Sequence, residues 1–233
     1  MIELFENKNG NLLLIQNQTS IGKKEVDVYK DAGVVQLNIQ GIEQIDYSAF
    51  KNWKSLRSIF LKDTEIISSA AFWGCDNLEK IQFGSQLRII DYRAFANCKA
   101  LKELVFPRTL THIKQKAFEG CSSLEKINLS MGVQYIGHKA FASNYSYEDK
   151  KISSVILPWS LECMDSEAFA GKHIEYLEIP IGARKHSTRA FDGLIVDRAE
   201  MFLADEDSPF NEFEDYTIPD TEFLWDLLLK EEV

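Results

Sequence analysis

The stretch "RAFANCKALKELVFP", residues 93–107, is repeated 23 residues later as "KAFEGCSSLEKINLS", residues 116–130. A catalytic motif normally occurs once, whereas a phrase that recurs at constant spacing is typical of a structural unit that stacks on copies of itself. The Ala-Phe pair near the start of each phrase aligns the other copies. Its aromatic residue occurs at Phe50, Phe72, Phe95, Phe118, Phe141, Phe169 and Phe191, with spacings of 22, 23, 23, 23, 28 and 22 residues.

Other apolar positions keep a fixed distance from this phenylalanine. An aliphatic residue precedes it by five positions in most copies, and a leucine follows it by six in the first copies, before a period-two pair such as Ile81 and Phe83. This alternation predicts one short strand with one buried face in each unit, and the rest of the unit is predicted as tight turns. Because a single coil would leave its core open at both ends, the coils must stack with their strands in parallel.

The segment "IDYRAFANCKALKELVFP", residues 90–107, resembles the consensus of the BspA-like leucine-rich repeats, and the resemblance extends over residues 41–193. It implies an α/β leucine-rich repeat solenoid. This fold is a curved right-handed coil with a parallel β-sheet on the concave side and turns or short helices elsewhere. The resemblance also implies a scaffold for protein recognition and brings no catalytic motif to this chain.

The chain divides into three predicted parts. Residues 1–40 predict an N-terminal cap that contains a hairpin over 2–16 and the first solenoid strand. Residues 41–204 predict the solenoid, with about seven coils of 22–28 residues. The insertion at 143–151 is interpreted either as a neutral loop or as a loop near a binding face.

The third part, residues 205–233, holds the excess negative charge. It carries 11 acidic residues against one lysine, whereas residues 1–204 carry 25 of each sign. A body without excess positive charge argues against general binding of nucleic acids. Residues 222–230 predict a short amphipathic helix, which either caps the last coil or docks into a groove of another protein.

The ends and the hydropathy of the sequence bear on location. No stretch of 18 apolar residues occurs, so no membrane span is predicted. The first 16 residues lack the features of a secretory signal, which favours a cytoplasmic protein. A monomer is expected. The alternative is a secreted or surface adhesin that binds a host or matrix protein and whose leader has been removed.

Three cysteines share one column of the repeat, at Cys75, Cys98 and Cys121. Zinc sites need ligands that converge on one point, whereas one cysteine per coil forms a line, so buried thiols are expected. Cys163 lies outside this column and is expected to be accessible. The histidines occupy different repeat phases beside no recurrent nucleophile or carboxylate, so neither an enzyme nor a cofactor is predicted.

The strand positions that flank the buried residues must point outward and offer the best candidates for binding. Apolar members would be anchors for a partner protein, and charged members would orient it. The alternative is an unspecialised solvated face. The predicted contact residues on the concave sheet are Phe60, Lys80, Glu103, Val105, Lys126, Ile156 and Tyr176.

Overall fold

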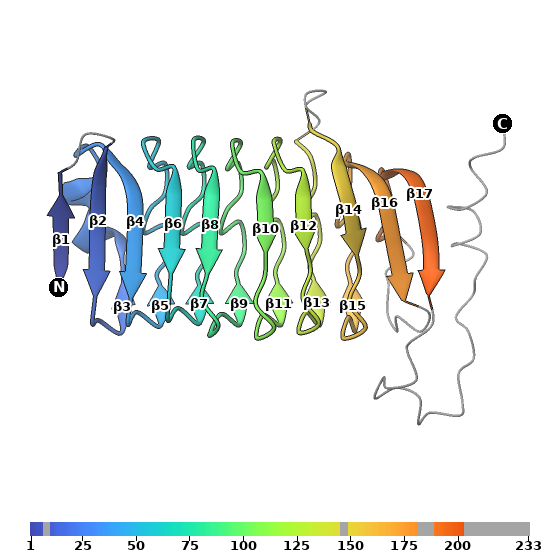
Figure 1. Ribbon diagram of the computed structural model, residues 1–233, viewed down its shortest axis with the longest axis horizontal. Helices are drawn as coiled ribbons and strands as arrows, with labels where there is room; N and C mark the ends of the chain where they lie inside the picture. The colour runs from blue at the N-terminus through green and yellow to red at the C-terminus, as the bar shows by residue number, and fades with distance from the viewer. Residues whose placement is uncertain (7–9, 145–148, 181–188, 203–233) are drawn as a thin grey trace.

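A computed structural model describes residues 1–6, 10–144, 149–180 and 189–202 of the chain. Ten long strands lie side by side along the molecule, which confirms the predicted solenoid (Figure 1). They are β1 (Ile2–Phe5), β2 (Asn11–Gln16), β4 (Val34–Gln40), β6 (Ser58–Leu61), β8 (Lys80–Phe83), β10 (Glu103–Val105), β12 (Lys126–Asn128), β14 (Ile152–Ile156), β16 (His173–Pro180) and β17 (Ile195–Phe202). We call the surface that these strands present to solvent the long-strand face.

The first strand pairs differently from the others. β1 is antiparallel to β2, the pairing predicted for residues 2–16, whereas β2 is already parallel to β4. The parallel stack therefore begins at Asn11, within the segment interpreted as a cap. Helix occurs only here among the described residues, in α1 (Lys23–Val26) and η1 (Asp27–Tyr29), and neither helix is long enough to span a membrane.

Each coil carries a second, two-residue strand that the sequence pattern did not predict. These strands form one parallel sheet, and from β5 to β15 its buried members are the apolar residues that precede each phenylalanine by five positions. They are β3 (Ser20–Ile21), β5 (Gln44–Ile45), β7 (Ile66–Ile67), β9 (Ile89–Ile90), β11 (His112–Ile113), β13 (Tyr135–Ile136) and β15 (Cys163–Met164). Two residues are too few to show the alternation of a strand, so the sequence pattern predicts a turn for this segment. We call its outer surface the short-strand face.

The repeated phenylalanines form the predicted ladder through the core. The rings of Phe50, Phe72, Phe95, Phe118, Phe141 and Phe169 are stacked with interplanar angles of 10° or less. Successive ring centroids are 5.1, 5.1, 5.3, 5.4 and 4.9 Å apart, close to the spacing of neighbouring strands. All six side chains are fully buried, so each coil closes the core of its neighbour.

The turns around the Ala-Phe pair stack as well, and form the third surface, the turn face. The amides of the first five ladder phenylalanines, from Phe50 to Phe141, donate to an alanine carbonyl in the next coil, as from Phe95 to Ala117 at 2.8 Å. The residue two positions before the phenylalanine has a positive φ in six coils, between 53° and 59°. Because none of these six residues is a glycine, the sequence did not reveal this left-handed turn.

The column three positions after the phenylalanine contains an unexpected residue. Cys75, Cys98 and Cys121 are buried, and each thiol donates to a phenylalanine carbonyl of the preceding coil at 3.2–3.4 Å. Lys172 occupies the column beyond the insertion and is fully buried. Its ammonium donates to the carbonyl of Cys121 at 2.9 Å and pairs with the carboxylate of Asp149 at 2.5 Å, which ties the insertion to the core.

Some predictions lie outside the described residues. They concern the amphipathic helix over 222–230 and the middle of the insertion at 145–148.

Truncating one ladder ring should strongly destabilise the protein. We expect Phe95→Ala or Phe118→Ala to lower the free energy of unfolding by about 3–5 kcal/mol, because the cavity lies between two coils. Lys126→Ala, at an exposed strand position, should change it by less than about 0.5 kcal/mol. Urea denaturation followed by circular dichroism measures both, and equal midpoints for the three variants would contradict the stacked core.

Thr64 offers a stabilising change. It occupies a buried column shared with Ile42, Leu87, Leu110 and Val133, and its buried hydroxyl has no hydrogen-bond partner among the residues that the structure describes. Thr64→Val should raise the free energy of unfolding by roughly 1 kcal/mol, because the desolvated hydroxyl is removed at nearly constant volume. The control Thr111→Val loses a hydrogen bond to the Arg88 carbonyl, so it should not raise the free energy of unfolding. If denaturation showed Thr111→Val to be more stable than Thr64→Val, the claim that the buried Thr64 hydroxyl destabilises the protein would be refuted.

Candidate functional site

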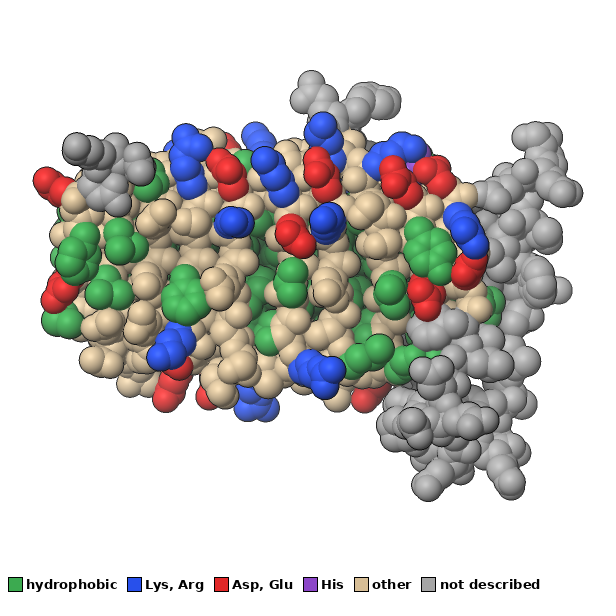
Figure 2. Space-filling view, in the orientation of Figure 1, with side chains coloured by type: hydrophobic (Ala, Val, Ile, Leu, Met, Phe, Trp, Pro, Cys, Tyr) green, Lys and Arg blue, Asp and Glu red, His purple; other side chains and the backbone are tan. Residues whose placement is uncertain are grey.

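The seven predicted contact residues all lie on the long-strand face, where they alternate with buried neighbours in their strands. Together with the residues beside them in the sheet register, they belong to two rows that run across the strands. The outer row contains Asn38, Phe60, Gln82, Val105, Asn128, Ile156 and Glu178, and the inner row contains Ser58, Lys80, Glu103, Lys126, Ser154, Tyr176 and Arg198. Figure 2 shows this face, with apolar side chains spread over its middle and most charged side chains towards its upper and lower edges.

The apolar members of the rows differ in exposure. Val105 and Ile156 have exposed fractions of 52% and 45%, which is high for aliphatic side chains in a sheet, and Phe60 is half-buried. Tyr176 is less available, because its hydroxyl donates to Glu200 at 2.9 Å and the guanidinium of Arg198 lies 5.7 Å from its ring centre. The hydrogen bond to Glu200 raises the pKa of Tyr176. Val105 and Ile156 are therefore the better anchors.

The charges of this face alternate in two directions. Along the strands the pairs are Glu79–Lys80, Lys102–Glu103 and Glu125–Lys126, so each coil reverses the order of signs. Glu103 and Lys126 are direct neighbours in the parallel register of β10 and β12. Such a pattern has little net charge, so it orients a partner more than it attracts one from a distance.

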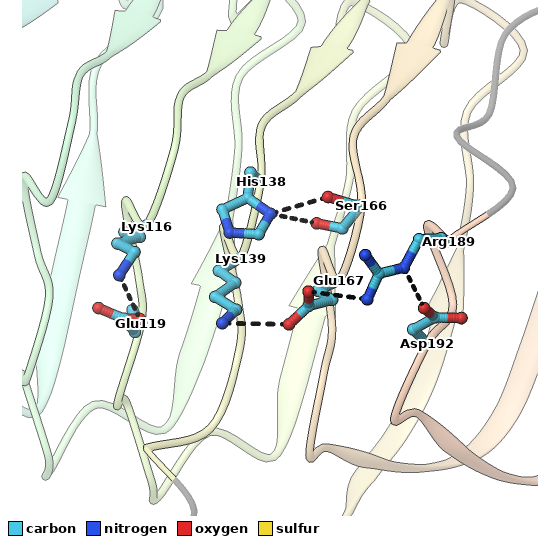
Figure 3. A network of polar contacts seen from close by, with 8 residues as sticks. All are labelled: Lys116, Glu119, His138, Lys139, Ser166, Glu167, Arg189 and Asp192. Atoms are coloured by element: carbon cyan, nitrogen blue, oxygen red, sulfur yellow. Dashed lines mark hydrogen bonds and ion pairs between the residues drawn. The ribbon is translucent and has the colours of Figure 1, made fainter.

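The turn face is different, because its charges pair with each other (Figure 3). Glu167 accepts from Lys139 at 3.1 Å and lies 3.5 Å from Arg189, which also pairs with Asp192 at 2.7 Å. The hydrogen bond from Lys139 holds the pKa of Glu167 below its usual value. Lys116 and Glu119 form a similar pair at 3.2 Å. These groups stabilise neighbouring coils and leave little unmatched charge for a ligand.

The short-strand face brings together side chains of the types that serve as acids, bases or nucleophiles in enzymes. His112, Tyr135 and Cys163 are register neighbours, and the Tyr135 hydroxyl donates to Asp165 at 2.5 Å. Burial and this hydrogen bond raise the pKa of Tyr135, so the phenol keeps its proton. The Cys163 thiol lies 3.9 Å from the same carboxylate. His112 contacts the Tyr135 ring, and its Nδ1 lies 2.9 Å from the hydroxyl oxygen of Thr111. Because the Thr111 hydroxyl donates to the carbonyl of Arg88 at 3.1 Å, its proton does not point at His112 as that of a nucleophile points at its base.

The cysteine column does not converge on a metal site. Its thiols point one per coil towards backbone carbonyls, and within the described ranges no group of three His, Cys, Asp or Glu side chains could hold a metal ion. Burial raises the pKa of Cys75 and of Cys121 to about 12. These thiols therefore stay protonated and act as small core residues.

Thiol alkylation should separate Cys163 from the column. At pH 8 we expect iodoacetamide to add one group to the folded protein, at Cys163, because the other three thiols are buried and protonated. Intact-mass spectrometry should show that the single adduct is absent from folded Cys163→Ser. The parent protein should take up four adducts in denaturant. Several adducts on the folded protein would contradict the burial of the column.

Comparisons with known proteins agree with this architecture. A family model for the BspA type leucine-rich repeat region matches residues 20–148 and 142–202 in six copies. A leucine-rich repeat protein of T. pallidum is similar in structure, with a TM-score of 0.54 and 22% identity over 87% of this chain and 83% of that one. A leucine-rich repeat protein from Bacteroides ovatus gives a TM-score of 0.49 and 18% identity over 87% and 75%. No curated protein matches the sequence.

The T. pallidum structure supports the fold, and the family model covers most of the chain. The chain therefore belongs to the BspA-type leucine-rich repeat family.

Proposed function

We propose that this chain is a non-catalytic recognition module that binds another protein on its long-strand face. Leucine-rich repeat domains generally serve as scaffolds for protein interaction, and the repeated core leaves the outward positions free to vary. The observation that carries the proposal is the exposure of Val105 and Ile156 on a regular, rigid sheet. Aliphatic side chains exposed to this degree are suited to anchor a partner because binding removes them from water.

The other surfaces support this choice of face. On the turn face the carboxylates of Glu119, Glu167 and Asp192 already pair with cations of the same surface. On the long-strand face, Lys80, Glu103 and Lys126 form no ion pair with any other residue that the structure describes. These three charges are therefore available to orient a bound protein.

Replacing the exposed apolar residues by the amides found in the adjacent coils should remove binding. The double variant Val105→Gln/Ile156→Gln copies the side-chain type of Gln82 in the same row, so its strands should tolerate it. We expect the immobilised variant to retain at least about tenfold less of the partner captured from a lysate of the native organism, as for the loss of hot-spot residues.

The matched control is Tyr47→Gln, which replaces a side chain of 69% exposure on the turn face. Quantitative mass spectrometry should show that this control captures as much partner as the parent protein. Circular dichroism should show that both variants are folded. Undiminished capture by the double variant, or loss of capture with Tyr47→Gln alone, would refute binding at the long-strand face.

A further inference from the structure

The outer row of the long-strand face repeats every two coils. From β4 to β14 its side chains are alternately amide and apolar, in the order Asn38, Phe60, Gln82, Val105, Asn128 and Ile156. The row is continuous across the two places where the sheet's strand pairing is interrupted. Phe83 and Phe106, which follow Gln82 and Val105, have ring centres 5.6 Å apart, and the amide of Ser153 donates to Glu125 at 2.9 Å.

The spacing of the coils matches the pitch of an α-helix. Along this part of the stack the core rings from Phe50 to Phe141 are 5.1–5.4 Å apart, and an α-helix rises about 5.4 Å per turn. A helix that lies across the strands would place one turn over each coil. Its residues i, i+7 and i+14 would then meet Phe60, Val105 and Ile156. An extended strand repeats its side chains every 6.6–6.8 Å or so and would lose register within a few coils.

The inner row adds a condition on charge. Lys80, Glu103 and Lys126 precede the outer-row residues of their strands by two positions, which places them roughly 6.6 Å to one side. The flank of a helix about 10 Å wide reaches this distance. The signs of the inner row alternate from coil to coil. A complementary helix therefore carries an acidic, a basic and an acidic side chain on that flank, one in each turn.

We propose that the long-strand face binds an amphipathic α-helix of a partner protein, lying along the axis of the stack. The helix places apolar side chains at i, i+7 and i+14 and polar ones over Gln82 and Asn128. Its acid–base–acid flank faces Lys80, Glu103 and Lys126. This inference rests on the proposed function and specifies the shape and chemistry of the partner.

Two synthetic peptides test the proposal. Both are 19-residue helices stapled on the outer face, with leucine at i, i+7 and i+14 and glutamine one turn after the first two leucines. One carries glutamate, lysine and glutamate on the flank, and the other carries lysine, glutamate and lysine. Fluorescence anisotropy with the full chain should show that the acid–base–acid peptide binds about three- to tenfold more tightly than its reverse.

A charge-reversed protein provides the decisive comparison. The variant Lys80→Glu/Glu103→Lys/Lys126→Glu keeps opposite charges in adjacent coils of the row, so it should fold. Circular dichroism can check this. This variant should prefer the reversed peptide by a similar factor, and Val105→Gln/Ile156→Gln should weaken both peptides. An unchanged preference, or no binding of either helix, would overturn the proposal.

Two other occupants would also overturn it. Peptide binding that appears only after residues 205–233 are removed would assign the face to the chain's own C-terminal segment. A dimer in sedimentation that the charge reversal dissociates would assign it to a second copy. The two proposals can fail separately. If the partner from the lysate needs Val105 and Ile156 but neither peptide binds selectively, the proposed protein recognition at this face is supported and the helical shape of the partner is refuted.

Discussion

The structure depends on one constraint, which is that a single coil cannot enclose its own core. Phe95 is fully buried only because Phe72 and Phe118 cover its two faces at 5.1 and 5.3 Å. The same stacking aligns the backbone of the turns, where the phenylalanine amides from Phe50 to Phe141 donate to a carbonyl in the next coil. Dispersion, burial and hydrogen bonding therefore impose one common repeat of about 5 Å on every surface of the molecule.

This repeat determines what the surfaces can do. Side chains at equivalent positions form straight rows, so a substitution in one coil changes one point of a row and leaves the scaffold intact. On the turn face the rows have become ion pairs, such as Lys139 with Glu167, that join the coils. On the long-strand face the rows keep exposed apolar residues, and Lys80, Glu103 and Lys126 form no ion pair with another described residue. This contrast favours the long-strand face for recognition.

Sequence alone predicts the stack, the phenylalanine ladder and the outward orientation of residues such as Val105, because these follow from spacing and alternation. It does not predict the short-strand sheet, since two residues such as Ile89–Ile90 are too few to show a period. It also misses the left-handed turns at Arg93 and Lys116, where side chains with a Cβ stand where glycine would be expected. The burial of Lys172 depends on a partner, Asp149, that the insertion supplies from a distant position.

Hydroxyl-radical footprinting of the chain with its captured partner tests the central claim most directly. The oxidation rates of Phe60, Val105 and Ile156 report the solvent exposure of the long-strand face, and those of Tyr47 and Tyr92 report that of the turn face. Binding at the long-strand face predicts that the partner slows oxidation of the first set and leaves the second unchanged. Protection of Tyr47 and Tyr92 with unaltered oxidation of Val105 and Ile156 would contradict the account.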